Sequence, residues 1–304
     1  MSASGGLELT AVRWPALRTL WIAQIETDAE RTWVRTLLPT SIDGGNLFSL
    51  DSKLAVRQLP VAVRLEQIVA GEGQLWGLPD EGENLLLIKE STGEVRSRRL
   101  LRPACGVLAD PSGVVSLGQL WLSCSDVITA YKPEGGPGKV VRSPKSFHLL
   151  ASTGGVWALV PGRLVGIAGD AAGRRIVLRD AGEPRLWQAQ GDEAWALDLR
   201  SGNKALIRVN LATGAIRRFP LATRNQQIDS FAVGPNDIWV ALTDKPLILR
   251  FDRAEPRRPS AQIDLSKAAR SSEFQIFLTP DPSYLWVALF SNRHFKLFRI
   301  TAPK

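Results

Sequence analysis

The stretch FAVGPNDIWVALTDKPLILRFD (residues 231–252) contains three runs of strand length, FAV, DIWVAL and LILRFD, separated by short turn sequences. Val, Ile, Phe and Trp favour the pleated backbone of a strand, whereas the intervening Gly-Pro-Asn and Asp-Lys-Pro segments are typical of turns. Because each turn reverses the chain, the stretch predicts an antiparallel meander. Trp239 lies near the centre of its second strand.

Tryptophan recurs in the same short pattern along the chain, as in LWGLP, LWLSC, VWALV, AWALD and LWVAL. Successive anchors are 43, 45, 36, 38, 44 and 47 residues apart. A period in the low forties with four short strands per unit is typical of a propeller blade. A large flat side chain suits the wedge between neighbouring sheets, so we interpret these residues as packing residues. The anchors are Trp33, Trp76, Trp121, Trp157, Trp195, Trp239 and Trp286.

The sequence therefore predicts an all-β fold, a single seven-bladed β-propeller of four-stranded blades. The last unit has one strand too few, and LELTAVR (7–13) precedes the first complete unit. We expect 7–13 to form the outer strand of the last blade, beside residues 296–301, because this closure removes two exposed sheet edges. In the third unit, both CGVLAD (105–110) and GVVSLG (113–118) are candidates for the inner strand. The predicted blades, within one domain spanning 1–304, are 17–60, 64–101, 104–143, 147–181, 184–222, 227–265 and 272–304.

The composition, with 44% hydrophobic and 22% charged residues, predicts a soluble globular protein. No window approaches the roughly 18 continuous apolar residues of a membrane span, and the chain opens without a signal-peptide pattern. We therefore expect a cytoplasmic protein, although an excised secreted or periplasmic domain gives the same pattern. Cys105 and Cys124 do not have the spacing of a metal site. We favour buried free thiols over a disulfide, and both interpretations stay open.

The formal net charge of +8 raises the question of nucleic-acid binding. Much of this charge lies on predicted outer strands, for example at Arg96, Arg142, Arg217 and Arg218. Charged side chains there deter sheet-to-sheet aggregation, and they would be spread round the rim rather than gathered in one stripe. A nucleic-acid site needs a contiguous basic stripe, usually with stacking aromatic residues. The pattern does not favour nucleic acid as a partner, and it is typical of a monomeric propeller.

The phrase AVGPNDIWVA (232–241), followed by the strand LILRFD (247–252), resembles the repeat of the streptogramin B lyase superfamily and the related YVTN and quinoprotein-like seven-bladed propellers. The resemblance covers essentially the whole chain and implies the same fold. In the lyases it implies a Pro-His step in late blades and a Glu three positions after the blade tryptophan, which hold magnesium and transfer protons. Here Leu242 and Leu289 occupy those positions, and only Asp198 supplies a carboxylate. The lyase chemistry is therefore not expected.

Other catalytic patterns are also absent from the sequence. There is no G-x-S-x-G elbow, P-loop, dinucleotide fingerprint or zinc-type spacing, so we expect no metal and no cofactor. General acid–base catalysis at neutral pH often uses histidine. His148 precedes a predicted inner strand, and His294 lies in the loop SNRH on the same face. Together with Asp198 they are the catalytic candidates, and solvated loop residues are the other interpretation.

Propellers bind ligands where the loops between blades and the loops joining second to third strands form the mouth of the central channel. The basic residues expected there indicate an anionic small molecule or an acidic protein surface as the partner. Trp21 and Trp187 are expected on inner strands, where each can line the channel or simply pack. The predicted ligand-binding residues are Trp21, Arg64, Arg163, Arg185, Trp187, Arg200, Arg224, Asp244 and Arg293.

The sequence thus predicts a non-catalytic binding or scaffolding propeller that engages such a partner at the channel mouth. A lyase- or hydrolase-type enzyme acting at the same mouth is the alternative. A lectin is the third interpretation, disfavoured because the repeats have diverged too far to supply equivalent sugar pockets.

Overall fold

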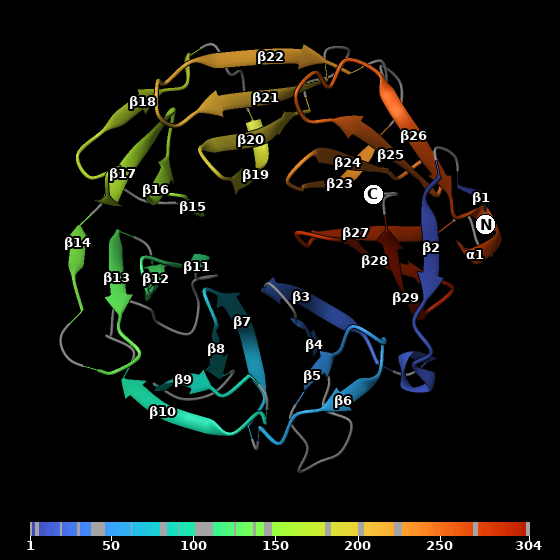
Figure 1. Cartoon of the computed structure of the whole chain (residues 1–304), viewed down its shortest axis with the longest axis horizontal. Helices are drawn as coiled ribbons and strands as arrows, with labels where there is room; N and C mark the ends of the chain where they lie inside the picture. The colour runs from blue at the N-terminus through green and yellow to red at the C-terminus, as the bar shows by residue number, and fades with distance from the viewer. Residues whose placement is uncertain are drawn as a thin grey trace. The chain divides into compact units, whose positions relative to one another are not determined.

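The computed structural model describes residues 2–3, 6–18, 20–28, 31–37, 46–61, 63–79, 84–90, 92–100, 112–124, 126–135, 138–142, 148–179, 184–199, 204–221, 227–269 and 273–301. The chain divides into two compact units, residues 23–179 and residues 1–22 with 180–304. Each unit consists of antiparallel sheets of short strands (Figure 1).

Residues 23–179 contain blades 1 to 4, each a four-stranded antiparallel sheet in which chain neighbours pair. Blade 1 is β3 (Ile22–Asp28), β4 (Arg31–Thr36), β5 (Leu47–Leu50) and β6 (Val56–Gln58). Blade 2 is β7 (Leu65–Gly71), β8 (Gln74–Pro79), β9 (Asn84–Ile88) and β10 (Val95–Leu100). Blade 3 is β11 (Ser112–Ser116), β12 (Gln119–Cys124), β13 (Val127–Tyr131) and β14 (Val140–Arg142). Blade 4 is β15 (His148–Ser152), β16 (Gly155–Val160), β17 (Arg163–Gly169) and β18 (Arg175–Val177).

The other unit contains blades 5 to 7. Blade 5 is β19 (Pro184–Gln190), β20 (Glu193–Asp198), β21 (Ala205–Asn210) and β22 (Ile216–Pro220). Blade 6 is β23 (Ile228–Val233), β24 (Asp237–Leu242), β25 (Leu247–Asp252) and β26 (Pro259–Asp264). Blade 7 is β27 (Phe274–Pro280), β28 (Leu285–Ser291), β29 (His294–Thr301) and the N-terminal strand β2 (Glu8–Ala11). The described residues thus form seven blades of four antiparallel strands, which confirms the seven-bladed β-propeller.

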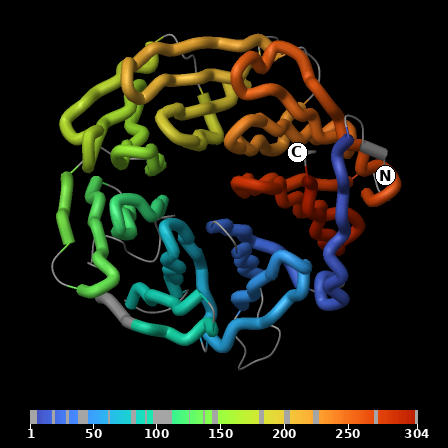
Figure 2. Tube along the Cα trace, viewed as in Figure 1, coloured from blue at the N-terminus to red at the C-terminus, as the bar shows by residue number. Residues whose placement is uncertain are grey.

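The N-terminal strand completes the last blade as the sequence predicts. Figures 1 and 2 show β2, in blue, beside the red C-terminal strand β29. Glu8 lies opposite Thr301 and Ala11 opposite Phe298, in antiparallel register. The sequence did not predict β1 (Ser2–Ala3), which adds a fifth strand to blade 6 by pairing with β26.

Short turns set the strand register. In blades 2 and 3 the first turn places two consecutive residues at positive φ, Glu72 with Gly73 and Leu117 with Gly118. Positive φ at both central residues matches the twist of the flanking strands, and glycine adopts it without steric cost. Short helical elements occur at the 3-10 turn η1 (Pro15–Arg18) and at α1 (Ser266–Ala269). In blade 3 the first strand is Ser112–Ser116 (SGVVS), within the second of the two candidate segments except for Ser112, whereas residues 105–110 lie outside the described residues.

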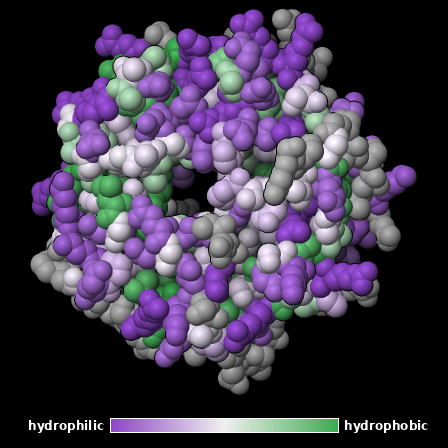
Figure 3. Space-filling model, viewed as in Figure 1, coloured by the Kyte–Doolittle hydropathy of each residue, from purple (hydrophilic) through white to green (hydrophobic). Residues whose placement is uncertain are grey.

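The tryptophan anchors pack inside the sheets, since none of the seven is more than 5% exposed. Trp33 of blade 1 shares a cluster with Leu65 and Ile68 on the first strand of blade 2. Trp121 of blade 3 likewise packs with Leu149 of blade 4. These contacts confirm the interpretation of the anchors as wedges between neighbouring sheets. On the face shown in Figure 3, hydrophilic residues predominate.

Hydrogen bonds between neighbouring first strands supplement this packing. The Gln24 side chain on β3 donates to Ile68 O at 2.7 Å and accepts from Ile68 N at 2.9 Å. Gln188 on β19 repeats this arrangement, because it donates to Phe231 O at 2.9 Å and accepts from Val233 N at 2.9 Å. We call each of these glutamine contacts a clasp. Each clasp satisfies backbone groups of the neighbouring first strand that would otherwise be buried without partners.

The cysteine expectation is wrong for Cys124, which is buried at the end of β12 and disulfide-bonded. Cys105, the other cysteine of the chain, lies outside the described residues. The small number of cysteines favoured free thiols, because the number alone does not show whether two cysteines lie close enough in space to form a disulfide.

Candidate ligand-binding site

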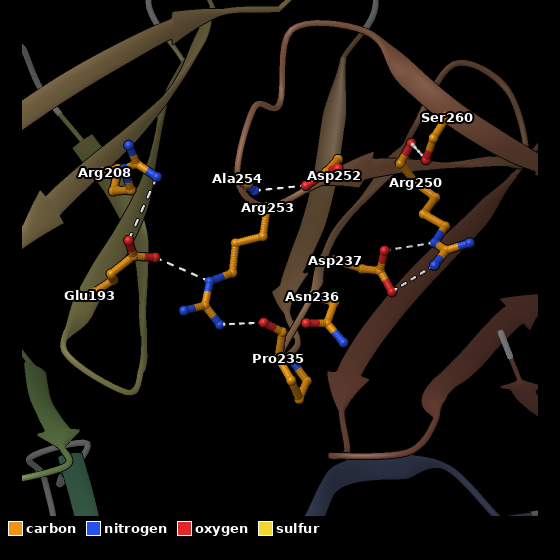
Figure 4. A pocket seen from close by; sticks show the side chains of 10 residues that line it. All are labelled: Glu193, Arg208, Pro235, Asn236, Asp237, Arg250, Asp252, Arg253, Ala254 and Ser260. Atoms are coloured by element: carbon orange, nitrogen blue, oxygen red, sulfur yellow. Dashed lines mark hydrogen bonds and ion pairs between the residues drawn. The ribbon is translucent and has the colours of Figure 1, made fainter. Parts of the chain in front are cut away.

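A pocket of about 630 Å³ lies between blades 5 and 6 (Figure 4). It is at the strand ends where the first strand of a blade connects to the second, and the third to the fourth. We call it the arginine pocket. Its residues come from β20 and β21 of blade 5 and from β24, β25, β26 and the adjoining turns of blade 6. They are Glu193, Arg208, Pro235, Asn236, Asp237, Arg250, Asp252, Arg253, Ala254 and Ser260.

In both blades an arginine of the pocket pairs with an acid and lies beside the anchor tryptophan. In blade 5, Arg208 lies directly opposite Trp195, with its guanidinium 5.6 Å from the indole centroid. Trp195 Nε1 donates to Glu193 Oε2 at 3.1 Å, and Arg208 Nη1 lies 3.6 Å from Glu193 Oε1. An acid two residues before the tryptophan therefore holds both the indole and the arginine of the next strand.

Blade 6 repeats two of these contacts, the arginine–acid pair and the arginine beside the tryptophan ring. Arg250 lies opposite Trp239, 5.6 Å from its ring centroid. Its Nε and Nη2 donate to the two carboxylate oxygens of Asp237 at 2.7 and 3.0 Å. A bidentate arginine–carboxylate pair fixes the guanidinium plane more firmly than a single contact.

Arg253 joins the two blades. Its Nε donates to Glu193 Oε2 of blade 5 at 3.1 Å, as Figure 4 shows. Its Nη1 donates to Pro235 O at 2.7 Å and to Gly234 O at 3.2 Å. Glu193 consequently faces two guanidinium groups, those of Arg208 and Arg253, while the lining as a whole balances three arginines against three carboxylates.

The pocket still has donors to offer. No described residue accepts a hydrogen bond from Arg250 Nη1 or Arg253 Nη2, although the other edges of both side chains are anchored. Arginine presents several donors in a rigid fork that matches carboxylate and phosphate groups. The volume is within the range of small-molecule pockets. The arrangement can therefore bind an anionic or hydroxyl-rich group without first reorganising its arginines.

The ligand-binding residues predicted from the sequence do not line this pocket. Many lie at the other ends of the strands, where the second strand of a blade connects to the third. Arg64 precedes β7, Arg163 begins β17, and Asp244 and Arg293 occupy turns between second and third strands. Arg64, Asp244 and Arg293 are exposed, and Arg163 is half-buried. Arg200 and Arg224 lie outside the described residues.

The two inner tryptophans differ from each other. Trp21 precedes β3, is 43% exposed, and packs against Phe290 with ring centroids 5.1 Å apart. Trp187 lies in β19 and is buried, and no described residue accepts a hydrogen bond from its Nε1. The preceding Leu186 is exposed at a φ of 54°, where a bulge interrupts the pairing between β19 and β20.

The three catalytic candidates have separate surroundings. Asp198 is fully buried and forms an ion pair with Arg218, which accounts for its burial. His294 is exposed at the start of β29. His148 Nδ1 lies 3.2 Å from Ser112 Oγ, which also accepts a hydrogen bond from Leu149 N at 2.8 Å. Ser112 lies in the sequence DPSG (110–113), which is typical of a turn and gives no catalytic signal.

The arginine pocket had a recognisable signal in the sequence. EAW followed by IRV, and DIW followed by LRF, each combine an acid two residues before tryptophan with an arginine on the third strand. Arg253 had no such signal, since its partner lies sixty residues away.

Two further searches bear on function. Across the part of the chain that the structure describes, His, Cys, Asp and Glu side chains form no group of three that could hold a metal ion. None of the described helices has the length and apolar character needed to span a membrane.

The comparisons with known proteins identify the fold. No protein-family model matches the chain, and no curated protein matches it. Kluyveromyces lactis Hsv2 matches with a TM-score of 0.63 and 14% identity, over 94% of this chain and 100% of that one. The WD40 domain of Neurospora crassa Pan2 matches with a TM-score of 0.62 and 11% identity, over 100% and 97%. Apo AztD from Citrobacter koseri matches with a TM-score of 0.51 and 12% identity, over 85% and 94%. At these identities the likeness concerns the fold, the β-propeller that this chain shares with them.

Proposed function

We propose that this propeller is a non-catalytic binding module whose arginine pocket takes a small anionic molecule carrying carboxylate or phosphate groups. The observation that carries the proposal is the sharing of Glu193 by Arg208 and Arg253. Two guanidinium groups share one carboxylate, so some of their N–H donors stay available, and an anionic ligand group accepts hydrogen bonds from them.

Preorganisation supports the same conclusion. The three arginine side chains are 16 to 21% exposed, and each is held by a carboxylate on one side. A ligand therefore does not have to order flexible side chains, which lowers the entropic cost of binding.

The test is calorimetric titration of the full chain with inorganic phosphate, sulfate and citrate at low ionic strength. We expect binding to at least one of these anions, weakened about tenfold or more by Arg253→Gln, because a hydrogen bond to a charged group contributes about 1.5–3 kcal/mol. Arg175→Gln is the matched control, since Arg175 is exposed on β18 of blade 4 and lines no pocket described above. Absence of binding to all three anions, or equal loss in both variants, would contradict the proposal.

The Ser112–His148 contact favours a second candidate function, a hydrolase-type enzyme using serine as nucleophile and histidine as base. A fluorophosphonate probe would label Ser112 in the intact protein, and His148→Ala would abolish the labelling. An unlabelled wild-type protein would remove this alternative.

We further propose that the protein acts in an oxidising compartment. The sequence favoured the cytoplasm, but a disulfide at Cys124 supports the secreted or periplasmic setting that the sequence left open. A monomer remains the expected state, and gel filtration with light scattering tests it.

A further inference from the structure

A second hollow, of about 790 Å³, runs along the outer edge of β29, away from the arginine pocket. We call it the edge groove. One wall is the segment that leaves β2 and enters η1, and the other is the first half of β29. Its residues are Ala11, Val12, Arg13, Trp14, Pro15, Leu17, His294, Phe295, Lys296, Leu297 and Phe298.

The groove borders an incompletely paired strand edge. Within the described residues, β2 pairs with β29 only from Phe298 to Thr301, and Val12 N then donates to Leu297 O at 2.9 Å. Beyond that point the chain turns into η1, although β29 continues back to His294. Backbone groups face a given edge at every second residue of an antiparallel strand. The N–H and C=O of Phe295 therefore face the same side as the carbonyl of Leu297, toward the groove.

Phe295, which is itself buried, links the groove to an aromatic cluster whose exposed members are Trp21 and Phe277. Phe295 lies 4.9 Å from Phe290, 6.4 Å from Trp21 and 6.4 Å from Phe277, measured between ring centroids. Trp21 and Phe277 are 43% and 44% exposed. Aromatic residues that remain this exposed on a folded domain are typical of the central residues of protein interfaces.

The charge around the groove has one sign. Arg13, His294 and Lys296 line it, no carboxylate lines it among the described residues, and the exposed Arg293 lies in the adjoining turn. Lys296 Nζ donates to Ala268 O at 2.5 Å, so its ammonium group is held against α1, which does not line the groove. Arg13 makes no ion pair with a described residue. This rim favours an acidic occupant.

We propose that the edge groove binds an extended acidic peptide segment of a partner protein. The segment pairs, beside η1, with the part of the β29 edge that β2 leaves unpaired, through main-chain hydrogen bonds with Phe295. An apolar or aromatic side chain of the peptide packs against the exposed rings of Trp21 and Phe277, which adjoin the groove through Phe295. Its carboxylates face Arg13 and Arg293. The open backbone edge favours a peptide over a nucleic acid, which offers no strand to pair.

The experiment is selection of displayed random twelve-residue peptides on the intact protein, followed by affinity measurement with fluorescently labelled synthetic copies. We expect the selected peptides to combine acidic residues with an aromatic or aliphatic anchor. Binding falls at least tenfold in Arg13→Glu and in Phe277→Ser, and also on N-methylation of alternate backbone amides of the peptide. Arg217→Glu is the matched control, because it makes the same charge change at an exposed site on another blade.

The outcomes are decisive in either direction. Thermal unfolding of each variant identifies any loss of binding that comes from misfolding, and Phe277→Leu then replaces Phe277→Ser as the conservative test of the aromatic contact. Selection of basic or uncharged peptides, binding that tolerates N-methylation, or tighter binding of oligothymidylate than of any selected peptide would overturn the proposal. Arg253→Gln should leave peptide binding unchanged, so this result is independent of the arginine pocket.

Discussion

Glu26 makes the stability of the protein depend on pH near neutrality. It lies on β3 between the clasp residue Gln24 and Asp28, and Gln24 Nε2 donates to its carboxylate at 2.9 Å. Burial raises the pKa of Glu26 from 4.5 to about 7, against the smaller lowering effects of hydrogen bonds from Gln24 and the Ala70 backbone. The folded protein therefore holds a proton that the unfolded chain releases above pH 4.5.

The sign of the effect follows from this raised pKa. Between pH 4.5 and about 7 the unfolded state binds fewer protons than the folded state, so stability falls as pH rises. At about 1.4 kcal/mol per pH unit, the loss from this one group reaches about 3 kcal/mol above pH 7. Glu90, Asp229 and Asp281 also have raised pKa values, mainly through burial, and act in the same direction.

Glu26→Gln isolates the contribution of Glu26. The amide keeps an acceptor for Gln24 and Ala70 but cannot ionise, so the variant should gain up to about 3 kcal/mol over wild type on going from pH 5 to pH 8. Urea unfolding of both proteins at the two pH values measures this difference, and Glu66→Gln, at an exposed position on β7, is the control. If the gap between wild type and Glu26→Gln were the same at pH 5 and pH 8, the buried-carboxyl reasoning would be refuted.

Three other expectations concern stability and thiol chemistry. Arg218→Ala should destabilise the protein by about 3–5 kcal/mol in chemical unfolding, because it leaves the buried Asp198 carboxylate without its cation. A loss of unfolding free energy below about 1 kcal/mol would contradict this. Deleting residues 1–13 should lower the free energy of unfolding by about 3–6 kcal/mol and lower the melting temperature, because it removes β2 with the buried Leu7 and Val12. An unchanged melting temperature would show that β2 does not close blade 7. Cys124 should resist maleimide in the denatured, non-reduced protein and react after reduction, with a thermal destabilisation of about 2–4 kcal/mol; labelling without reductant would rule out the disulfide.

The sequence predicted the fold because its signals are local and repeated. Each tryptophan anchor occupies the same position in a short strand, and the missing strand of blade 7 could be matched with LELTAVR by counting. The strand β1 escaped prediction because Ser2 and Ala3 have no strand pattern of their own and acquire one only beside β26.

The candidate sites were harder to predict because they depend on residues distant in sequence. Arg253 and Glu193 belong to different blades, and only the fold brings them together. The same holds for Ser112 and His148, which begin the first strands of blades 3 and 4. The edge groove exists because β2 pairs with only part of β29, from Phe298 to Thr301, and leaves the first half of β29 uncovered by a strand. Periodicity in the sequence does not show this difference in strand length.

The pairing of β2 with β29 also has a consequence in time. Ala11 and Phe298 lie opposite each other although about 290 residues separate them in the chain. At about 5–20 residues per second, a ribosome makes the second strand roughly 15 to 60 s after the first. Throughout that interval the N-terminal strand waits without its partner, and blade 7 is the last blade that synthesis allows to form. Protection of residues 8–11 by a chaperone during translation would therefore matter more than for any other strand of this protein.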